Sequence, residues 1–411
     1  MRRRDLLLAA PALTLAGSAA AAPAPPEART LTASRFGAVG DGRADDTEAL
    51  QKALDATFRG AEAGLLRIEP GAYRVTRPLR IALEDDKTHR FTRQHGISAR
   101  GALIRSEIND GNVIDLTSQA TARFFLIDGI EIRGRGQEGH GISMRCSGQG
   151  HYLYNLCLRN VVVQGCGGDG CRMVGNIFEG QIVNSYFRDN KGNGATFGHD
   201  KNRGILSAMH VFGAVFGGNG GDGAALVDQC TDVSFHGCYF LLNDRFGLNA
   251  GDGCTLLSNC GFENNHRKAK DFASGDAGIR LQVFGTLVGC TAYSIHHQTH
   301  LVRAFITNQL VMVGCTASGG GDAHGAGLAK LQGTGKAGAT LIGCRGAVMQ
   351  AGGIEAVEIG GAGGGVKFGA KWDSGALPRL GDYTLWVDGT GRLRIKRGLP
   401  QADQDGMPVG T

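Results

Sequence analysis

The feature that most constrains the fold is a phrase that recurs from the middle of the sequence onward: an apolar run, a corner residue, a small residue and a second short run. Its copies are "QIVNSYFRDN", "MHVFGAVFGGN", "VSFHGCYFLLN", "LLSNCGFENN", "LVGCTAYS", "VMVGCTASG" and "TLIGCRGA". Every copy has Asn or Gly at the corner, namely Asn184, Gly213, Gly237, Asn259, Gly289, Gly314 and Gly343. These two residues most easily adopt a left-handed backbone, so a sharp bend is predicted at each. Corners 22 to 30 residues apart are typical of a solenoid with one coil per repeat.

Positions that follow each corner also recur, and stacked coils would place them in columns about 4.8 Å apart. The small residue is Ser185, Ala214, Cys238, Cys260, Cys290, Cys315 or Cys344. Four copies continue with Phe187, Phe216, Phe240 and Phe262, and then with Asn190, Asn219, Asn243 and Asn265. The cysteines are therefore predicted to be buried packing residues. The paired C-x-x-C spacing of a zinc site is absent, and we predict no metal site made of cysteine.

A further strand completes each coil and begins after a glycine, as in "GHGISMRC", "GDGCRMV", "GNGATFGHD" and "GDGAALVD". Its alternation predicts that one set of side chains points inward: Ile142, Met144, Ala195, Phe197, Leu248, Ile279 and Leu281. Short strands repeated three to a coil predict an all-β parallel β-helix.

The two ends of the predicted solenoid differ from its middle. Residues 44–58, "ADDTEALQKALDATF", have helical spacing with acidic residues first, which predicts a capping helix. "YTLWVDGTGRLRIKRG" predicts a C-terminal β-hairpin. We therefore divide the chain into an export signal at 1–24, a capped β-helix domain at 30–346, and a Gly-rich segment with a hairpin tail at 347–411.

The N-terminus combines Arg2, Arg3 and Arg4 with a short apolar run and then small residues. This pattern resembles a twin-arginine signal, which predicts bacterial export to the periplasm or the medium. No later segment is apolar enough to cross a membrane, so no membrane partner is expected after cleavage. The formal charge is only +5, and the sequence shows no concentrated basic face. Both observations argue against a nucleic-acid partner.

The stretch "FGAVGDGRADDTEALQKALD", followed by "LLRIEPGAYRVTRPLRI", resembles the opening of the pectate-lyase-like right-handed parallel β-helix superfamily. The matching positions are Phe36, Gly37, Gly40, Asp41, Gly42, Asp45, Asp46, Thr47, Ala49, Gln51, Pro70, Gly71 and Tyr73. The resemblance implies a right-handed coil and a protein that processes or binds a glycan. It selects no chemistry, because the polygalacturonase-like motifs do not occur together and the epimerase-like D-P-H-E motif is missing.

The resemblance places the substrate groove along one strand face, which we expect to be the glycine-started strand. Outward positions by alternation are Ser143, Arg145, Arg172, Thr196, Asn249, Arg280 and Gln282. Arginine binds carboxylate bidentately, so this row suits an acidic polysaccharide; the alternative is a solvated polar face. The predicted substrate-binding residues are Arg145, Arg172, Asn249, Arg267, Lys268 and Gln282. The oligomeric state is left open.

Two catalytic chemistries are compatible with the sequence. Proton abstraction beside a uronate carboxylate, by a lyase or epimerase, would use cations such as Arg280, Arg267 and Lys268 with His199 or His266 as base. We favour it because the predicted row has arginines and no acidic residue. A glycoside hydrolase would instead use Asp228 and Asp252, which occupy one phase of successive coils.

Three further sequence features qualify these candidates. Asp228 and Asp252 could alternatively bind Ca²⁺, the one candidate cofactor. His296, His297 and His300 form H-H-x-x-H without the glutamate of a zinc protease, so zinc catalysis is not favoured. A non-catalytic glycan-binding or structural protein is the remaining alternative.

Overall fold

The computed structural model describes residues 30–59, 64–84, 94–148, 150–198, 204–228, 230–251, 254–268, 277–282, 284–294, 300–306, 308–319, 327–333, 338–346, 348–351, 355–360, 366–368, 379–380 and 382–409. The predicted export signal lies outside these residues. No helix in the described ranges has the length and apolar character needed to span a membrane.

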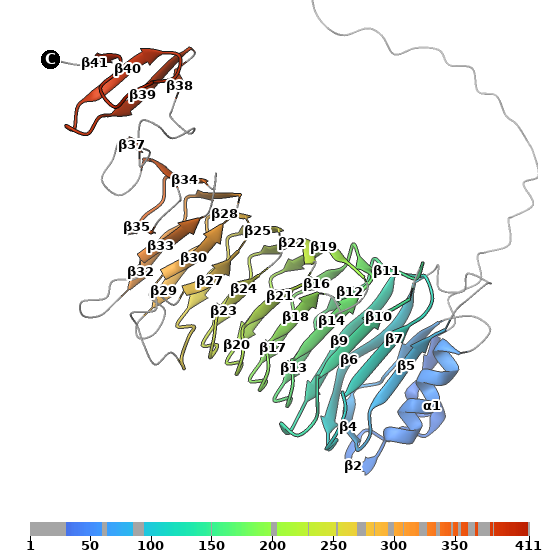
Figure 1. Ribbon diagram of the computed structural model, residues 1–411. Helices are drawn as coiled ribbons and strands as arrows, with labels where there is room; N and C mark the ends of the chain where they lie inside the picture. Colours follow the sequence, from blue (N-terminus) through green and yellow to red (C-terminus); the bar gives the residue numbers. More distant parts are fainter. Residues whose placement is uncertain are drawn as a thin grey trace, which may run out of the picture.

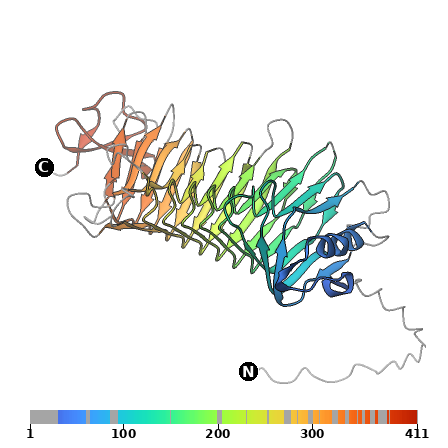
Figure 2. The ribbon, with the colours of Figure 1, turned by 90° about the horizontal axis from the view of Figure 1, so that it is seen from below.

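The described chain is an elongated parallel β-helix capped at one end by its single α-helix, α1 (Figures 1 and 2). The coils form two long sheets, which we call sheet A and sheet B. Each regular coil contributes one strand to sheet B and two strands to sheet A, and the Asn or Gly corner separates those two strands. We call the sheet A strands before and after the corner the first and second limbs. The predicted all-β parallel β-helix is confirmed.

Sheet B has eleven parallel strands. They are β5 (Leu79–Leu83), β7 (Ile114–Ser118), β10 (Ile142–Cys146), β14 (Cys171–Gly175), β18 (Ala195–Gly198), β21 (Ala224–Val227), β24 (Leu248–Ala250), β27 (Ala277–Leu281), β30 (His300–Ile306), β33 (Gly327–Gly333) and β35 (Val348–Ala351).

The first limb of sheet A begins near the N-terminus and continues to the last coil. Its strands are β1 (Thr30–Thr32), β3 (Leu65–Arg67), β8 (Ala122–Arg123), β11 (Leu153–Tyr154), β12 (Cys157–Arg159), β15 (Ile177–Phe178), β16 (Gln181–Val183), β19 (Leu206–Phe212), β22 (Cys230–His236), β25 (Cys254–Ser258), β28 (Phe284–Val288), β31 (Gln309–Val313), β34 (Gly338–Ile342) and β36 (Glu355–Ile359).

The second limb follows the corners. Its strands are β2 (Asp41–Asp45), β4 (Gly71–Val75), β13 (Val162–Gln164), β17 (Tyr186–Arg188), β20 (Val215–Gly217), β23 (Tyr239–Leu241), β26 (Gly261–Glu263), β29 (Thr291–Ser294) and β32 (Thr316–Gly319). Two long strands, β6 (His95–Ser106) and β9 (Phe125–Arg133), run through both limbs.

The columns predicted from the repeat are present. All seven predicted corner residues have positive φ, between 48° and 62°. The four phenylalanines stack, with ring centroids 5.5, 5.0 and 4.7 Å apart along the column. The buried asparagines form a ladder, in which Asn219 Nδ2 donates to Asn243 Oδ1 at 2.9 Å and Asn243 Nδ2 to Asn265 Oδ1 at 2.8 Å. The cysteines after the corners are buried beside them.

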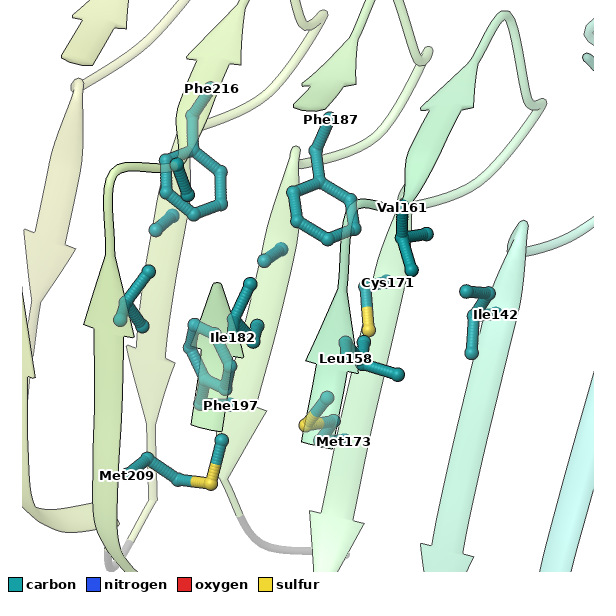
Figure 3. Close-up of a cluster of buried hydrophobic side chains, with 14 of the residues drawn as sticks. Ile142, Leu158, Val161, Cys171, Met173, Ile182, Phe187, Phe197, Met209 and Phe216 are labelled. Atoms are coloured by element: carbon teal, nitrogen blue, oxygen red, sulfur yellow. The ribbon is translucent and has the colours of Figure 1, made fainter. Parts of the chain in front are cut away.

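The core is a continuous apolar column inside the coils, part of which is drawn in Figure 3. The side chains predicted to point inward from sheet B all have 0% exposure. They are Ile142, Met144, Ala195, Phe197, Leu248, Ile279 and Leu281. Because the inward side chains are fixed by strand alternation, the chemistry of the outward side chains can vary from coil to coil.

The motif that carries the family resemblance stabilises the N-terminal end. Helix α1 spans Thr47–Phe58, so the predicted start at residue 44 is three residues early. The reason is that Asp45 belongs to β2 and binds the Thr47 and Thr76 hydroxyls, while Asp46 accepts from the Val39 and Gly40 amides. Gln51 holds the helix to sheet B through both backbone groups of Arg80, at 2.8 and 2.9 Å.

The C-terminal region holds more of the solenoid than the sequence predicted. Strands β35 and β36 still pair in parallel with β33 and β34, so the predicted boundary at residue 346 falls inside the β-helix. β37 (Val366–Phe368) then pairs antiparallel with β36. The predicted hairpin is confirmed as β39 (Tyr383–Val387) and β40 (Leu393–Arg397), in a sheet with β38 (Arg379–Leu380) and β41 (Met407–Pro408) around the buried Trp386.

Candidate functional site

One column of outward positions runs in register through the first ten of the eleven strands of sheet B. From the N-terminal end it contains Arg80, Asp115, Ser143, Arg172, Thr196, Ala225, Asn249, Arg280, Arg303 and Lys330. Five of the residues predicted for the row therefore share one column. Three successive strands at its C-terminal half carry Arg280, Arg303 and Lys330, so cations recur there about every 4.8 Å. Arg303 and Lys330 were not among the predicted residues.

The column is not uniformly exposed, and this corrects part of the predicted row. Ser143 and Thr196 are buried at 7% and 2% exposure, whereas Arg172, Asn249 and Arg280 are half-buried. Thr196 is covered because its hydroxyl donates to Asp169 at 2.9 Å and accepts from Asn193 at 3.0 Å. Arg145 is exposed, in a parallel outward column with Val174, Gly198 and Val227.

A second polar ladder lies at the turn that leads into sheet B. At this turn one side chain per coil accepts the backbone N–H of the equivalent residue in the next coil. In four of the five coils that side chain belongs to the central residue of a G-x-G motif. The ladder runs from Asn112 through His140, Asp169 and Asn193 to Asp222, and ends at the Phe246 amide. Its donor to acceptor distances lie between 2.7 and 3.0 Å. We call these five residues the turn ladder.

Two acids of the turn ladder, Asp169 and Asp222, contact residues of the column. Asp222 Oδ2 accepts from Asn249 Nδ2 at 2.9 Å, and Asn249 Oδ1 accepts from Arg280 at 3.2 Å. Gln282, with its amide oxygen turned to Arg280, accepts from that guanidinium at 2.5 Å. Burial raises the pKa of Asp222, although the Asn249 hydrogen bond and the nearby Arg245 oppose the shift. Arg280 thus connects Asn249 with Gln282, and Asn249 joins these predicted residues to one buried acid, Asp222.

This network corrects the expectation that the row contains no acidic residue. Asp115 occupies the column itself, and both Asp169 and Asp222 contact it from the turn ladder. Asp169 and Asp222 are only 6% and 1% exposed, and their oxygens are engaged by protein donors. At the C-terminal half of the column the surface groups are therefore cations and amides, with the acids beneath them.

The loops predicted to border the groove lie next to this network. Arg267 contacts the buried Asp244 at 2.8 Å, and Lys268 pairs with the other oxygen of the same carboxylate. Arg245, the next residue, lies 3.7 Å from Asp222. The His266 ring meets Phe246 edge to face, with centroids 5.1 Å apart. The loop residues therefore lie beside the Asp222 network. Arg267 and Lys268 reach it through Asp244, the neighbour of Arg245, and His266 reaches it through Phe246.

Of the predicted carboxylate pair, only Asp228 lies within the described residues. Asp228 is exposed beyond the end of β21, three residues past Ala225, the register partner of Asn249. Asp252 and His199 lie outside the described residues. In the described ranges no three His, Cys, Asp or Glu side chains converge to hold a metal ion. Ca²⁺ at Asp228 and Asp252 therefore stays a prediction.

Two histidines that the sequence reasoning did not select belong to this edge of sheet B. His140, in the turn ladder, accepts the Asp169 amide at Nδ1, so its proton is on Nε2; burial lowers the pKa of His140, while Asp169 opposes that shift. His300 begins β30, three residues before Arg303, and is 8% exposed. Burial, reinforced by Lys330, lowers the pKa of His300. The repeated G-x-G motif was the available signal for the ladder, whereas His300 was noted only as part of the H-H-x-x-H pattern.

Comparison with known proteins identifies the architecture. Residues 112–284 match the family model described as "Right handed beta helix region". The chain is a right-handed parallel β-helix protein. Residues 322–411 of this β-helix protein match a second family model, "Capsule depolymerase". No curated protein matches the chain.

Solved structures with the same fold include enzymes and phage proteins. The mannuronan C-5 epimerase AlgE4 A-module of Azotobacter vinelandii has a TM-score of 0.50 at 15% identity, covering 83% of this chain and 98% of that one. The enzymatically active domain of bacteriophage CBA120 tailspike protein 2 gives 0.54 at 15%, covering 78% and 48%. The N-terminal fragment of bacteriophage Phi29 gene product 12 gives 0.53 at 15%, covering 80% and 66%. At these identities the β-helix protein shares the fold with them, and the fold alone.

Proposed function

We propose that the protein processes a polysaccharide and that its substrate is acidic. The observation that carries the proposal is the run of Arg280, Arg303 and Lys330 in three adjacent strands of sheet B. Cations repeated at the strand spacing suit a polymer that carries carboxylates at intervals, because each guanidinium can bind a carboxylate through two N–H donors. The match of residues 322–411 to a capsule depolymerase model supports a polysaccharide as the substrate.

The reaction that this arrangement favours is proton abstraction from the carbon beside a uronate carboxylate. Arg280 and Arg303 would bind the carboxylate and stabilise the charge that develops on it as the proton leaves. Asn249 and Gln282 hold the Arg280 guanidinium in place, so less side-chain freedom is lost on binding. The electron pair then expels the glycosidic oxygen in a lyase, or takes a proton on the opposite face in an epimerase.

The base in this proposal is His300, with His266 as the alternative. His300 shares the C-terminal half of sheet B with the three cations, and its lowered pKa leaves the imidazole neutral at pH 7 and able to accept a proton. His266 packs against Phe246, whose backbone N–H donates to Asp222 at the end of the turn ladder. His199, the other predicted base, is outside the described residues.

The experiment compares the mature protein, with and without Ca²⁺, on acidic and neutral polysaccharides. Ultraviolet absorbance of unsaturated uronate, new reducing ends and solvent deuterium incorporation are followed together. Absorbance with reducing ends supports a lyase, and deuterium incorporation without chain cleavage supports an epimerase. Reducing ends without absorbance overturn proton abstraction and favour the hydrolase that uses Asp228 and Asp252. Binding without any reaction favours the non-catalytic alternative.

Variants connect either reaction to this surface. Arg280→Gln and Arg303→Gln are expected to remove activity on the acidic polymer. Arg188→Gln is the matched control, since that arginine is exposed on sheet A, away from the column. Unchanged activity in the double variant Arg280→Gln/Arg303→Gln would overturn the placement of the site.

A further inference from the structure

A second surface with different chemistry lies on the first limb of sheet A, outward from β19, β22 and β25 (Figure 1). Four side chains from these adjacent strands form one chain of hydrogen bonds. His210 Nδ1 lies 2.7 Å from Ser234 Oγ, Ser234 Oγ lies 3.0 Å from His236 Nε2, and His236 Nδ1 lies 2.7 Å from Ser258 Oγ. We call His210, Ser234, His236 and Ser258 the His–Ser row.

An aromatic ring flanks the His–Ser row. Phe212 pairs in register with His236, and the two rings stack with centroids 5.0 Å apart and planes 16° from parallel. Phe212 is 40% exposed, which is unusual for phenylalanine in a chain whose other stacked phenylalanines are buried. His236 thus covers one face of the Phe212 ring, and the rest of that ring is accessible beside a line of hydrogen-bonding groups.

The His–Ser row contains no Arg, Lys, Asp or Glu side chain, in contrast to the sheet B column. Burial and the neighbouring His210 lower the pKa of His236. The serine hydroxyls can exchange donor and acceptor roles along the chain of hydrogen bonds, because a hydroxyl does both. Next in register after Ser234 comes Leu256, which is 40% exposed, and after Ser258 comes Val288, also 40% exposed. In the described strands, none of the register positions between Phe212 and Val288 carries a charged Asp, Glu, Lys or Arg side chain.

The row is better suited to binding than to acyl transfer. A serine nucleophile needs oxyanion donors as well as a histidine base. Here β22 and β25 lie between paired strands on both sides, so their backbone N–H groups are committed to the sheet ladder. A ligand would instead meet hydroxyl and imidazole groups along one edge and an aromatic face on the other.

We propose that Phe212 and the His–Ser row form a binding site for a neutral sugar unit of a glycan. The flat C–H face of a pyranose stacks on an aromatic ring, and its hydroxyls are matched by neutral donors and acceptors beside that ring. The site is separate from the sheet B column and does not depend on the proposed reaction there. Its ligand is distinguished from the sheet B substrate by the absence of charge.

Titration calorimetry with neutral hexasaccharides of glucose, mannose and galactose tests the site, using the full mature chain. At least one is expected to bind, with Phe212→Ala weakening it about 3- to 10-fold and Phe212→Tyr retaining it. Tyr293→Ala is the matched control, because Tyr293 is an aromatic on sheet A with 43% exposure. His236→Phe, which keeps the stacked ring and removes both nitrogens, should also weaken binding.

The proposal would be overturned if no neutral hexasaccharide bound, or if Phe212→Ala left the binding unchanged. Activity of Phe212→Ala on the acidic polymer separates the two sites. If that activity persists while neutral binding is lost, the second site stands independently of the first. Loss of neutral binding in Arg280→Gln as well would place the neutral ligand on sheet B and contradict the assignment to sheet A.

Discussion

Sheet B and the first limb of sheet A are built from the same coils, yet their outward faces differ in chemistry. The sheet B column carries Arg280, Arg303 and Lys330 above buried acids, whereas the sheet A face carries Phe212 and the His–Ser row. Both rest on one column of buried side chains and one corner geometry. The difference shows that the inward side chains build one repeated core, while the outward side chains vary in chemistry from one face to the other.

The largest expected effect is on the charged face. Arg280→Gln/Arg303→Gln should lower kcat/KM on the acidic polymer by roughly 100-fold or more, since each charge-assisted contact contributes about 1.5–3 kcal/mol. Steady-state kinetics beside Arg188→Gln measure it. Neutral hexasaccharide affinity should not change, and a parallel loss there would mean that the two faces are not independent.

A change inside the coil should affect both faces together. Asn243→Ala removes the side chain that bonds Asn219, Asn265 and a Phe216 carbonyl, and leaves buried groups unsatisfied. We expect the free energy of unfolding to fall by about 2 to 4 kcal/mol, measured by urea titration. The exposed Asn308→Ala should change it by less than about 0.5 kcal/mol. Equal stability of the two variants would refute a structural role for the ladder.

Salt should distinguish the faces without any mutation. Raising the NaCl concentration from roughly 0.05 to 0.5 M shortens the Debye length and should weaken acidic-polymer binding several-fold. Binding of the neutral ligand should stay within about twofold. Binding titrations at each salt concentration measure both, and equal salt dependence would contradict the charge contrast.

The smallest expected effect concerns pH. A base that acts in its neutral form works above its pKa and is lost as pH falls through it. Because the pKa of His300 is lowered from its ordinary value near 6.5, kcat should change less than about twofold between pH 7 and 8 and should fall only in more acidic solution. His300→Gln should abolish that acidic limb. An acidic limb that persists in His300→Gln but disappears in His266→Gln would assign the base to His266.

The fold could be predicted from the sequence because its rules are local. A left-handed corner selects Asn or Gly, and alternation sets Ile142 or Leu281 inward, with no knowledge of distant residues. The helix start was misjudged because Asp45 and Asp46 bond groups outside the helix. The end of the solenoid was placed early because β36 pairs with β34 and is followed by a corner at Gly360, but no cysteine follows that glycine as in the preceding copies.

The candidate site was less predictable because it depends on contacts between coils. Alternation placed Arg172, Asn249 and Arg280 in one outward row, but only the register shows Arg303 and Lys330 continuing it. The Asp222 to Asn249 bond joins residues 27 positions apart, which no spacing rule indicates. The His–Ser row spans three strands for the same reason. Asp228 remains a proposal, since its expected partner Asp252 is outside the described residues.

The Asn and Gly corners have a consequence for how such a protein can change. Each corner belongs to one coil, and equivalent positions in successive coils lie about 4.8 Å apart. Inserting or deleting one whole coil between Arg172 and Arg280 would change the distance between these two residues by one coil spacing. The contacts in the core would still repeat from coil to coil. The distance between binding groups is therefore adjustable only in discrete steps, and the length of the glycan that fits would change by the same increments.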